Sequence, residues 1–143
     1  MLVVDDNEAK CYVLSRWLAR AGHRVLTAAT GMEALAVVEE SRPDLVILDV
    51  HLPDISGIEV CRRIRATPAT AQLPVMHVSA IAVDTSDRVR GLIEGADAYL
   101  IDPIDPRELV ATVTTLLRSA AARQRAQILA LRLGQLHTVT HRV

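Results

Sequence analysis

The sequence predicts an α/β fold in which helices cover both faces of a parallel β-sheet. Short runs of aliphatic and β-branched residues alternate with longer helical patterns along the chain, which is typical of strands joined by helical crossovers. Most of these short runs are apolar without strict alternation, as expected of strands that are buried on both faces. Half of the 143 residues are hydrophobic and 23% are charged, which is enough apolar material for one compact core.

Five segments fit strands and five fit helices. The predicted strands are residues 2–4, 23–28, 44–49, 74–79 and 98–101. The predicted helices are residues 8–21, 32–40, 56–66, 85–94 and a last one that starts near residue 105. Gly22 and Gly95 are expected to end the first and fourth helices. Asp105 followed by Pro106 is a helix start with a capping residue and a proline in the first turn.

The last helix is expected to be long. Its first part carries apolar residues that would pack on the sheet, and beyond Arg118 the composition shifts to alanine, arginine and glutamine. We therefore predict a compact domain over residues 1–118 and a helical extension or linker over residues 119–143. The leucines and isoleucine of the extension follow no clean heptad, so the pattern gives little support to a coiled coil.

Charge and composition argue against several classes of function. The formal net charge is −1, so no basic field attracts nucleic acid or an anionic membrane. Three aromatic residues offer few platforms on which bases could stack, and no apolar run approaches the roughly 20 residues of a membrane span. Cys11 and Cys61 match no metal-binding spacing. We expect a cytoplasmic protein that contacts neither nucleic acid nor the membrane.

Polar residues follow three of the predicted strands directly. Asp5 and Asp6 end the first strand, Asp49 ends the third, and Ser79 ends the fourth. In an open parallel sheet, chemistry collects at the carboxyl ends of the strands. Three converging carboxylates repel one another and require a cation, and hard oxygen ligands suit Mg²⁺. A carboxylate at such a metal can attack a phosphoryl donor in line.

Each acid also has a simpler explanation, as a turn former or helix cap. Asp6 precedes Glu8, for example, and could cap the first helix.

Four segments together point to a known family. LVVDD, PDLVILDVHLPDISGIEV, MHVSA and GADAYLIDP occur in this order, and the chain resembles the receiver domains of bacterial two-component systems over roughly residues 1–118. The resemblance implies a flavodoxin-like, doubly wound parallel sheet of five strands in the order 2-1-3-4-5. It also implies a signalling receiver rather than an enzyme, one that assists only its own aspartyl phosphorylation and dephosphorylation.

The resemblance assigns the metal site and the acceptor. By position, Asp49 is similar to the phosphoacceptor, and Asp6 is similar to the direct ligand of Mg²⁺. Asp5 would act on the metal mostly through water. The backbone carbonyl of His51 would complete the protein's share of the metal shell.

The resemblance also assigns a switch. Ser79 is similar to the hydroxyl that moves to bind the phosphoryl group, and Tyr99 is similar to the aromatic side chain that follows it inward. Pro53 and Gly57 would shape the loop after the acceptor, and a cis peptide bond would precede Pro103.

One position departs from the family. A receiver of this kind has a lysine before the cis proline, where it pairs with phosphoryl oxygens, and this sequence has Asp102 there. Asp102 could turn to solvent and leave slower phosphorylation, or act as a fourth acid at the metal. A third alternative is a degenerate receiver that works as a phosphorylation-independent interaction or dimerisation module. Lys10 or His51 could replace the missing cation, although a solvated helix lysine and an exposed loop histidine are the simpler interpretations.

The family implies partners on both sides of the switch. A sensor histidine kinase or a phosphotransfer protein would donate the phosphoryl group. A downstream protein or a fused output domain would read the change, and the last helix could pair with its copy in a homodimer. The chain could be a piece of a hybrid sensor kinase or a multidomain regulator.

Two other readings are disfavoured. An aspartyl-phosphate phosphatase needs a second acid where His51 stands, and a dinucleotide-binding protein needs a glycine-rich loop that the sequence lacks after its first strand.

Overall fold

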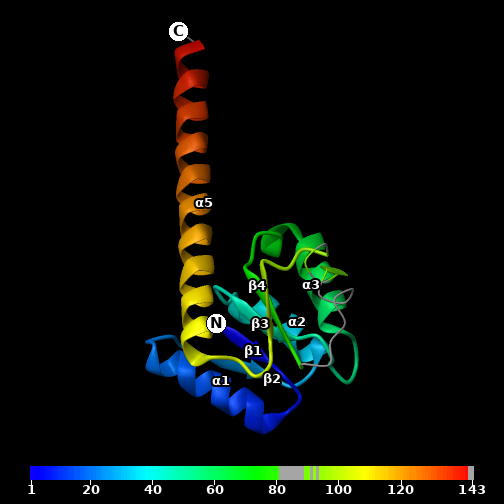
Figure 1. The fold of residues 1–143 in the computed structure, drawn as a ribbon. Helices are drawn as coiled ribbons and strands as arrows, with labels where there is room; N and C mark the ends of the chain where they lie inside the picture. Colours follow the sequence, from blue (N-terminus) through cyan, green and yellow to red (C-terminus); the bar gives the residue numbers. More distant parts are fainter. Residues whose placement is uncertain (81–88, 91, 93, 142–143) are drawn as a thin grey trace.

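The computed structural model describes residues 1–80, 89, 90, 92 and 94–141. Its centre is a five-stranded parallel sheet in the order β2-β1-β3-β4-β5 (Figure 1). The strands are β1 (Leu2–Val4), β2 (Leu26–Ala28), β3 (Val46–Asp49), β4 (Val75–Ser79) and β5 (Ala98–Ile101). The helices are α1 (Glu8–Arg20), α2 (Gly31–Ser41), α3 (Gly57–Ala66), the short 3₁₀ helix η1 (Pro68–Thr70) and α5 (Pro106–His141). The predicted fold class and strand order are confirmed.

Alternate residues of the strands supply two cores. Val3, Ile47 and Met76 pack with residues of α1 and α5 on one face of the sheet. Leu2, Val46 and other residues of the opposite parity pack with α2 and α3 on the other face. This division follows from the pleat, because successive side chains of a strand point to opposite faces.

The second strand is shorter than predicted. Residues 23–28 were expected to form it, and only Leu26–Ala28 pair with β1. His23 instead belongs to the end of α1, because its N–H donates to the carbonyl of Leu18 over 3.1 Å. Gly22 makes this turn with a φ of 95°, a conformation that favours glycine. β2 is an edge strand, and Leu26 is exposed rather than buried on both faces.

The third strand starts two residues later than predicted, at Val46, and the fourth starts one residue later, at Val75. Within the predicted fourth helix, residues 89, 90 and 92 are helical, and residues 85–88, 91 and 93 lie outside the described residues. Gly95 ends this segment as expected, with a φ of 109° and its N–H donating to the carbonyl of Leu92.

The last helix runs unbroken from Pro106 to His141 and projects well beyond the sheet (Figure 1). Asp105 caps it by accepting the N–H of Arg107 over 2.8 Å. Leu109 and Val113 are fully buried against the sheet, whereas Leu129 and Leu131 are exposed. The division at residue 118 therefore falls inside one continuous helix, and it stays a prediction.

Candidate functional site

The carboxyl ends of β1 and β3 bring three acids together. β1 and β3 are hydrogen-bonded neighbours in parallel register, so the residues that end them lie at the same edge of the sheet. Asp5, Asp6 and Asp49 each offer a carboxylate oxygen, and these oxygens lie within 4.8 Å of one another. Asp6 is not used as a helix cap, because the side chain of Asn7 caps α1 by accepting the N–H of Lys10 over 3.1 Å.

Of the three acids, Asp5 is buried and Asp49 is half-buried. Asp5 is only 4% exposed, and its Oδ1 accepts the N–H of Asn7 over 2.9 Å. Burial raises the pKa of Asp5 above its usual value, while the Asn7 N–H and Lys10 oppose that change. Burial also raises the pKa of Asp49. The N–H of His51 donates to Asp49 Oδ1 over 3.1 Å and partly opposes this rise. Crowded, half-buried carboxylates of this kind favour binding of a cation.

The donor set fits a hard divalent cation. Oδ2 of Asp5 is buried and accepts no hydrogen bond from the described residues. It therefore has a free lone pair beside the oxygens of Asp6 and Asp49. Oxygen-only ligands with open positions for water suit Mg²⁺. His51 is exposed in the loop directly after β3, and its carbonyl as a metal ligand stays a prediction.

Ser79 and Tyr99 lie on the strands beside the acids. Ser79 ends β4, is completely buried, and its hydroxyl has no hydrogen-bond partner within the described part of the chain. A buried hydroxyl without a partner is costly. Tyr99 is half-buried on β5, opposite His77 in the register, and the two rings meet edge to face with centroids 5.8 Å apart.

Lys10 and Asp102 form an ion pair at this site. Lys10 Nζ lies 2.8 Å from Asp102 Oδ2 and 3.7 Å from Asp5 Oδ2. The side chain of Lys10 is 20% exposed, so the interpretation as a solvated helix lysine is wrong. Although burial lowers it, the pKa of Lys10 is raised overall by the hydrogen bond to Asp102 and by the charge of Asp5.

The ion pair bears on two of the alternatives weighed for Asp102, the turn to solvent and the fourth acid at the metal. Asp102 does not turn away to solvent, since its carboxylate holds Lys10, and the three-acid cluster of the described residues does not include it. The sequence marked Lys10 as a candidate cation for the site, but it held no sign of the pairing with Asp102. Lys10 is the chain's only lysine, and it stands on the first turn of α1 four residues after Asp6.

Gly57 and Asp54 position the loop after Asp49. A Cβ on Gly57 would lie 2.1 Å from the carbonyl oxygen of Asp49, so this close approach requires glycine. Asp54, which sequence reasoning missed, accepts the N–H groups of Gly31 and Met32 over 2.8 Å each. These bonds hold the pKa of Asp54 at about 2 and tie the loop to the start of α2. The peptide bond between Asp102 and Pro103 is cis, as predicted.

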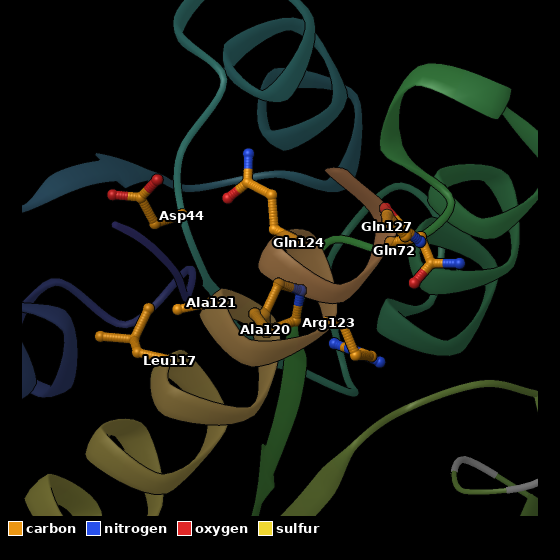
Figure 2. Close-up of a pocket in the computed structure, with 9 residues that line it drawn as sticks. Asp44, Gln72, Leu117, Ala120, Ala121, Arg123, Gln124 and Gln127 are labelled. Carbon is orange, nitrogen blue, oxygen red and sulfur yellow. The ribbon is translucent and has the colours of Figure 1, made fainter. Parts of the chain in front are cut away.

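A separate groove lies at the amino ends of β3 and β4, opposite the carboxyl ends that carry the acids. Its volume is about 380 Å³, and it runs between α5 and the segments that precede β3 and β4. Figure 2 shows Ala120, Arg123 and Gln124 of α5 along it, with Asp44 to one side of them and Gln72 to the other. None of the acids of the site lines this groove, so it is distinct from the carboxylate cluster.

Comparison with known proteins gives a consistent family. The family model for the response regulator receiver domain matches residues 1–114. The chain is 46% identical over 118 residues to the transcriptional regulatory protein AfsQ1 of Streptomyces coelicolor, covering 82% of this chain and 51% of that protein. It is 42% identical over 141 residues to the phosphate regulon regulator PhoB of Rhizobium meliloti, covering 99% of this chain and 62% of that protein. The chain thus spans only part of the length of these curated relatives.

Solved structures agree. A CheY-like receiver domain protein of Methanospirillum hungatei superposes with a TM-score of 0.79 at 29% identity, over 85% of this chain and 95% of that one. The receiver domain of a signal transduction histidine kinase from Syntrophus aciditrophicus gives 0.76 at 31% identity, over 82% and 89%. Among the described residues, no helix has the length and hydropathy needed to span a bilayer.

Proposed function

The chain belongs to the response regulator receiver domain family, and we propose that it accepts a phosphoryl group on Asp49 in a Mg²⁺-dependent reaction. The observation that carries the proposal is the meeting of three carboxylates, within 4.8 Å, at one edge of the sheet. The buried hydroxyl of Ser79, at the end of the adjacent strand, supports it.

Asp5, Asp6, Asp49 and the carbonyl of His51 would hold the metal. When bound, Mg²⁺ neutralises the charge that develops on the transferring phosphoryl oxygens. A carboxylate oxygen of Asp49 attacks the phosphorus of the donor, and the leaving group departs on the opposite side with the electron pair of the broken bond. The N–H of His51 holds Oδ1 of Asp49 and so fixes the orientation of the attacking group.

Ser79 would report the reaction. Its hydroxyl can donate to a phosphoryl oxygen, and this contact would satisfy a group that is buried without a partner among the described residues. The carbonyl of Ser79 accepts the N–H of Asp102 over 2.7 Å, so a shift of Ser79 would reach the loop between β5 and α5. Inward rotation of Tyr99 would carry the change to the face formed by β5 and α5.

A sensor histidine kinase or a phosphotransfer protein would be the donor, in the cytoplasm. Relatives such as AfsQ1 and PhoB are named as transcriptional regulators and are longer than this chain. We therefore expect a downstream protein or a fused output domain to read the state of the receiver. The exposed leucines and isoleucine of α5 are available for a homodimer.

A phosphorylation-independent module was the alternative that Asp102 suggested. The reason for this alternative was that Asp102 stands where the family's lysine would supply a cation to the site. Lys10 lies within 3.7 Å of Asp5, so a cation remains there, and the phosphorylated switch is the better-supported function.

Incubation with acetyl phosphate and Mg²⁺, followed by intact-mass measurement, tests the proposal. We expect one labile phosphoryl adduct on the unmodified chain and none on Asp49→Asn. Equal labelling of the two proteins would remove Asp49 from its role.

A further inference from the structure

We propose that Lys10 of α1, held in place by Asp102, is the cation that binds the phosphoryl group in this protein. The inference rests on phosphorylation of Asp49 and assigns a further binding residue to that reaction. The resemblance places a lysine in the loop after β5, where this chain has Asp102, and the cation of this site stands on the first turn of α1.

The geometry places this ammonium group at the acid cluster. Nζ of Lys10 lies between two carboxylates, 2.8 Å from Asp102 and 3.7 Å from Asp5. Asp5 belongs to the same cluster of oxygens as Asp49. Lys10 thus bridges the edge formed by β1 and β3 to the loop that follows β5.

The other cations that the structure describes in ion pairs are engaged elsewhere. Arg62 and Arg63 pair with Glu59 on α3, Arg65 pairs with Asp97, and Arg107 pairs with Asp105. Of the basic side chains paired in the described part of the chain, Lys10 alone contacts an acid of the site.

Phosphorylation changes the charge that faces Lys10. The single negative charge of the Asp49 carboxylate is replaced by a phosphoryl group with about two negative charges. A lysine ammonium has three N–H donors on a flexible stem. Lys10 can therefore donate to a phosphoryl oxygen while it keeps its bond to Asp102. Asp102 acts as a positioning residue that keeps the ammonium at the site before phosphorylation.

In this arrangement the charge of Lys10 has opposite effects on the affinity for Mg²⁺ and on the affinity for the phosphoryl group. Its charge repels Mg²⁺ at the neighbouring carboxylates, and it attracts the phosphoryl group. Removing the charge should strengthen binding of Mg²⁺ alone and weaken binding of a phosphoryl mimic. A purely structural role of Lys10 would not move the two affinities in opposite directions.

The experiment compares the unmodified chain with Lys10→Met, with Lys10→Met/Asp102→Lys, and with Arg20→Met as a matched control. Arg20 is an exposed cation at the far end of the same helix. Calorimetry measures the affinity for Mg²⁺ alone and for beryllofluoride at saturating Mg²⁺. Intact mass after incubation with acetyl phosphate measures the rate of labelling.

We expect Lys10→Met to bind Mg²⁺ more tightly, and to lose about tenfold in beryllofluoride affinity and labelling rate, as for one charged hydrogen bond. Lys10→Met/Asp102→Lys should regain most of the labelling, because it returns a cation to position 102. Arg20→Met should behave like the unmodified chain. The double variant Lys10→Met/Asp102→Asn removes both members of the ion pair, and a loss as large as in Lys10→Met would show that the loss does not come from an unpaired Asp102.

Unchanged labelling and unchanged Mg²⁺ affinity in Lys10→Met would overturn the role of Lys10 alone, with phosphorylation of Asp49 intact. Failure of the unmodified chain to be labelled, together with failure to bind beryllofluoride, would instead overturn the proposed function and this inference with it.

Discussion

Lys10 and Asp102 are joined by an ion pair of 2.8 Å between the first turn of α1 and the loop after β5. Both side chains are partly shielded from water, at 20% and 35% exposure. The pair connects an element on one face of the sheet to the loop that leads into α5, beside the three clustered acids. The pair accounts for a negative charge at position 102, because the carboxylate of Asp102 has Lys10 as its basic partner.

The first prediction concerns the strength of this pair without metal. Lys10→Met, Asp102→Asn and the double variant form a cycle, measured by urea unfolding in EDTA. Solvent screens the pair at these exposures, so we expect a small but measurable coupling free energy of about 0.2–1 kcal/mol. The coupling should decrease at high salt. A coupling that is zero at low salt would show that the two side chains do not interact in solution.

The second prediction concerns Gly57. A Cβ there would lie 2.1 Å from the carbonyl oxygen of Asp49, so backbone must move. We expect Gly57→Ala to lower the free energy of unfolding by about 1–3 kcal/mol and to slow labelling of Asp49.

Gly134 on α5 is the matched control, because a Cβ there meets nothing within 4 Å. Gly134→Ala should be neutral or stabilising by up to about 1 kcal/mol, since alanine favours helix. Equal effects of the two substitutions would contradict the close packing of Gly57.

The third prediction separates function from stability at Ser79. Its buried hydroxyl has no partner within the described chain, so Ser79→Ala should leave the free energy of unfolding unchanged or raise it by up to about 1 kcal/mol. The same variant should bind beryllofluoride more weakly, as measured by calorimetry.

Thr70→Val provides the contrast. The buried hydroxyl of Thr70 donates to the carbonyl of Ile64 over 2.9 Å, so its removal should destabilise the fold by about 1 kcal/mol and leave beryllofluoride binding alone. A loss of stability in Ser79→Ala as large as in Thr70→Val would argue that Ser79 has a structural partner.

The fourth prediction is a pH dependence from His77. Burial lowers the pKa of His77 from 6.5 to about 4, so in this pH range the unfolded chain binds a proton that the folded chain does not. The free energy of unfolding should therefore fall as pH drops from about 6.5 to about 4, by at most about 3.5 kcal/mol at about 1.4 kcal/mol per pH unit.

Urea unfolding across this pH range measures the effect, with His77→Leu as the control. That variant should lose the part of the slope due to His77 while the carboxylates keep theirs. An identical slope in both proteins would mean that folding does not lower the pKa of His77.

The fifth prediction concerns metal removal. Burial and the charge of Asp5 raise the pKa of Asp49, which means that the fold disfavours its charged form. Asp49→Asn should therefore stabilise the metal-free protein at neutral pH, because the variant has no charge to disfavour there. Addition of Mg²⁺ should stabilise the unmodified chain more than the variant, because binding to the folded state adds to stability. Equal stabilisation of both by Mg²⁺ would place the metal away from Asp49.

Part of the site followed from where residues stand relative to strand ends. Asp5 and Asp49 end strands that are neighbours in the sheet, so their meeting required only the strand order and the parallel direction. The role of Asp54 did not follow. Its carboxylate caps α2 from the loop after β3, and local sequence offers no sign of a bond between a loop and a helix so far apart in the chain.

The start of the second strand was set by the hydrogen bonds of the elements next to it. The second strand lost its first three predicted residues because His23 completes the turn that ends α1, and because β1 offers only three residues with which β2 can pair.

The sequence by itself determined the parallel sheet, its alternation with helices and the family, because apolar runs and strand-end acids are local patterns. Only the tertiary structure decided that Lys10 leaves solvent to pair with Asp102. A long, flexible side chain can reach several partners, and its choice depends on the carboxylates that the fold brings near it. That choice rests on electrostatics across the assembled site, which no local pattern in the sequence contains.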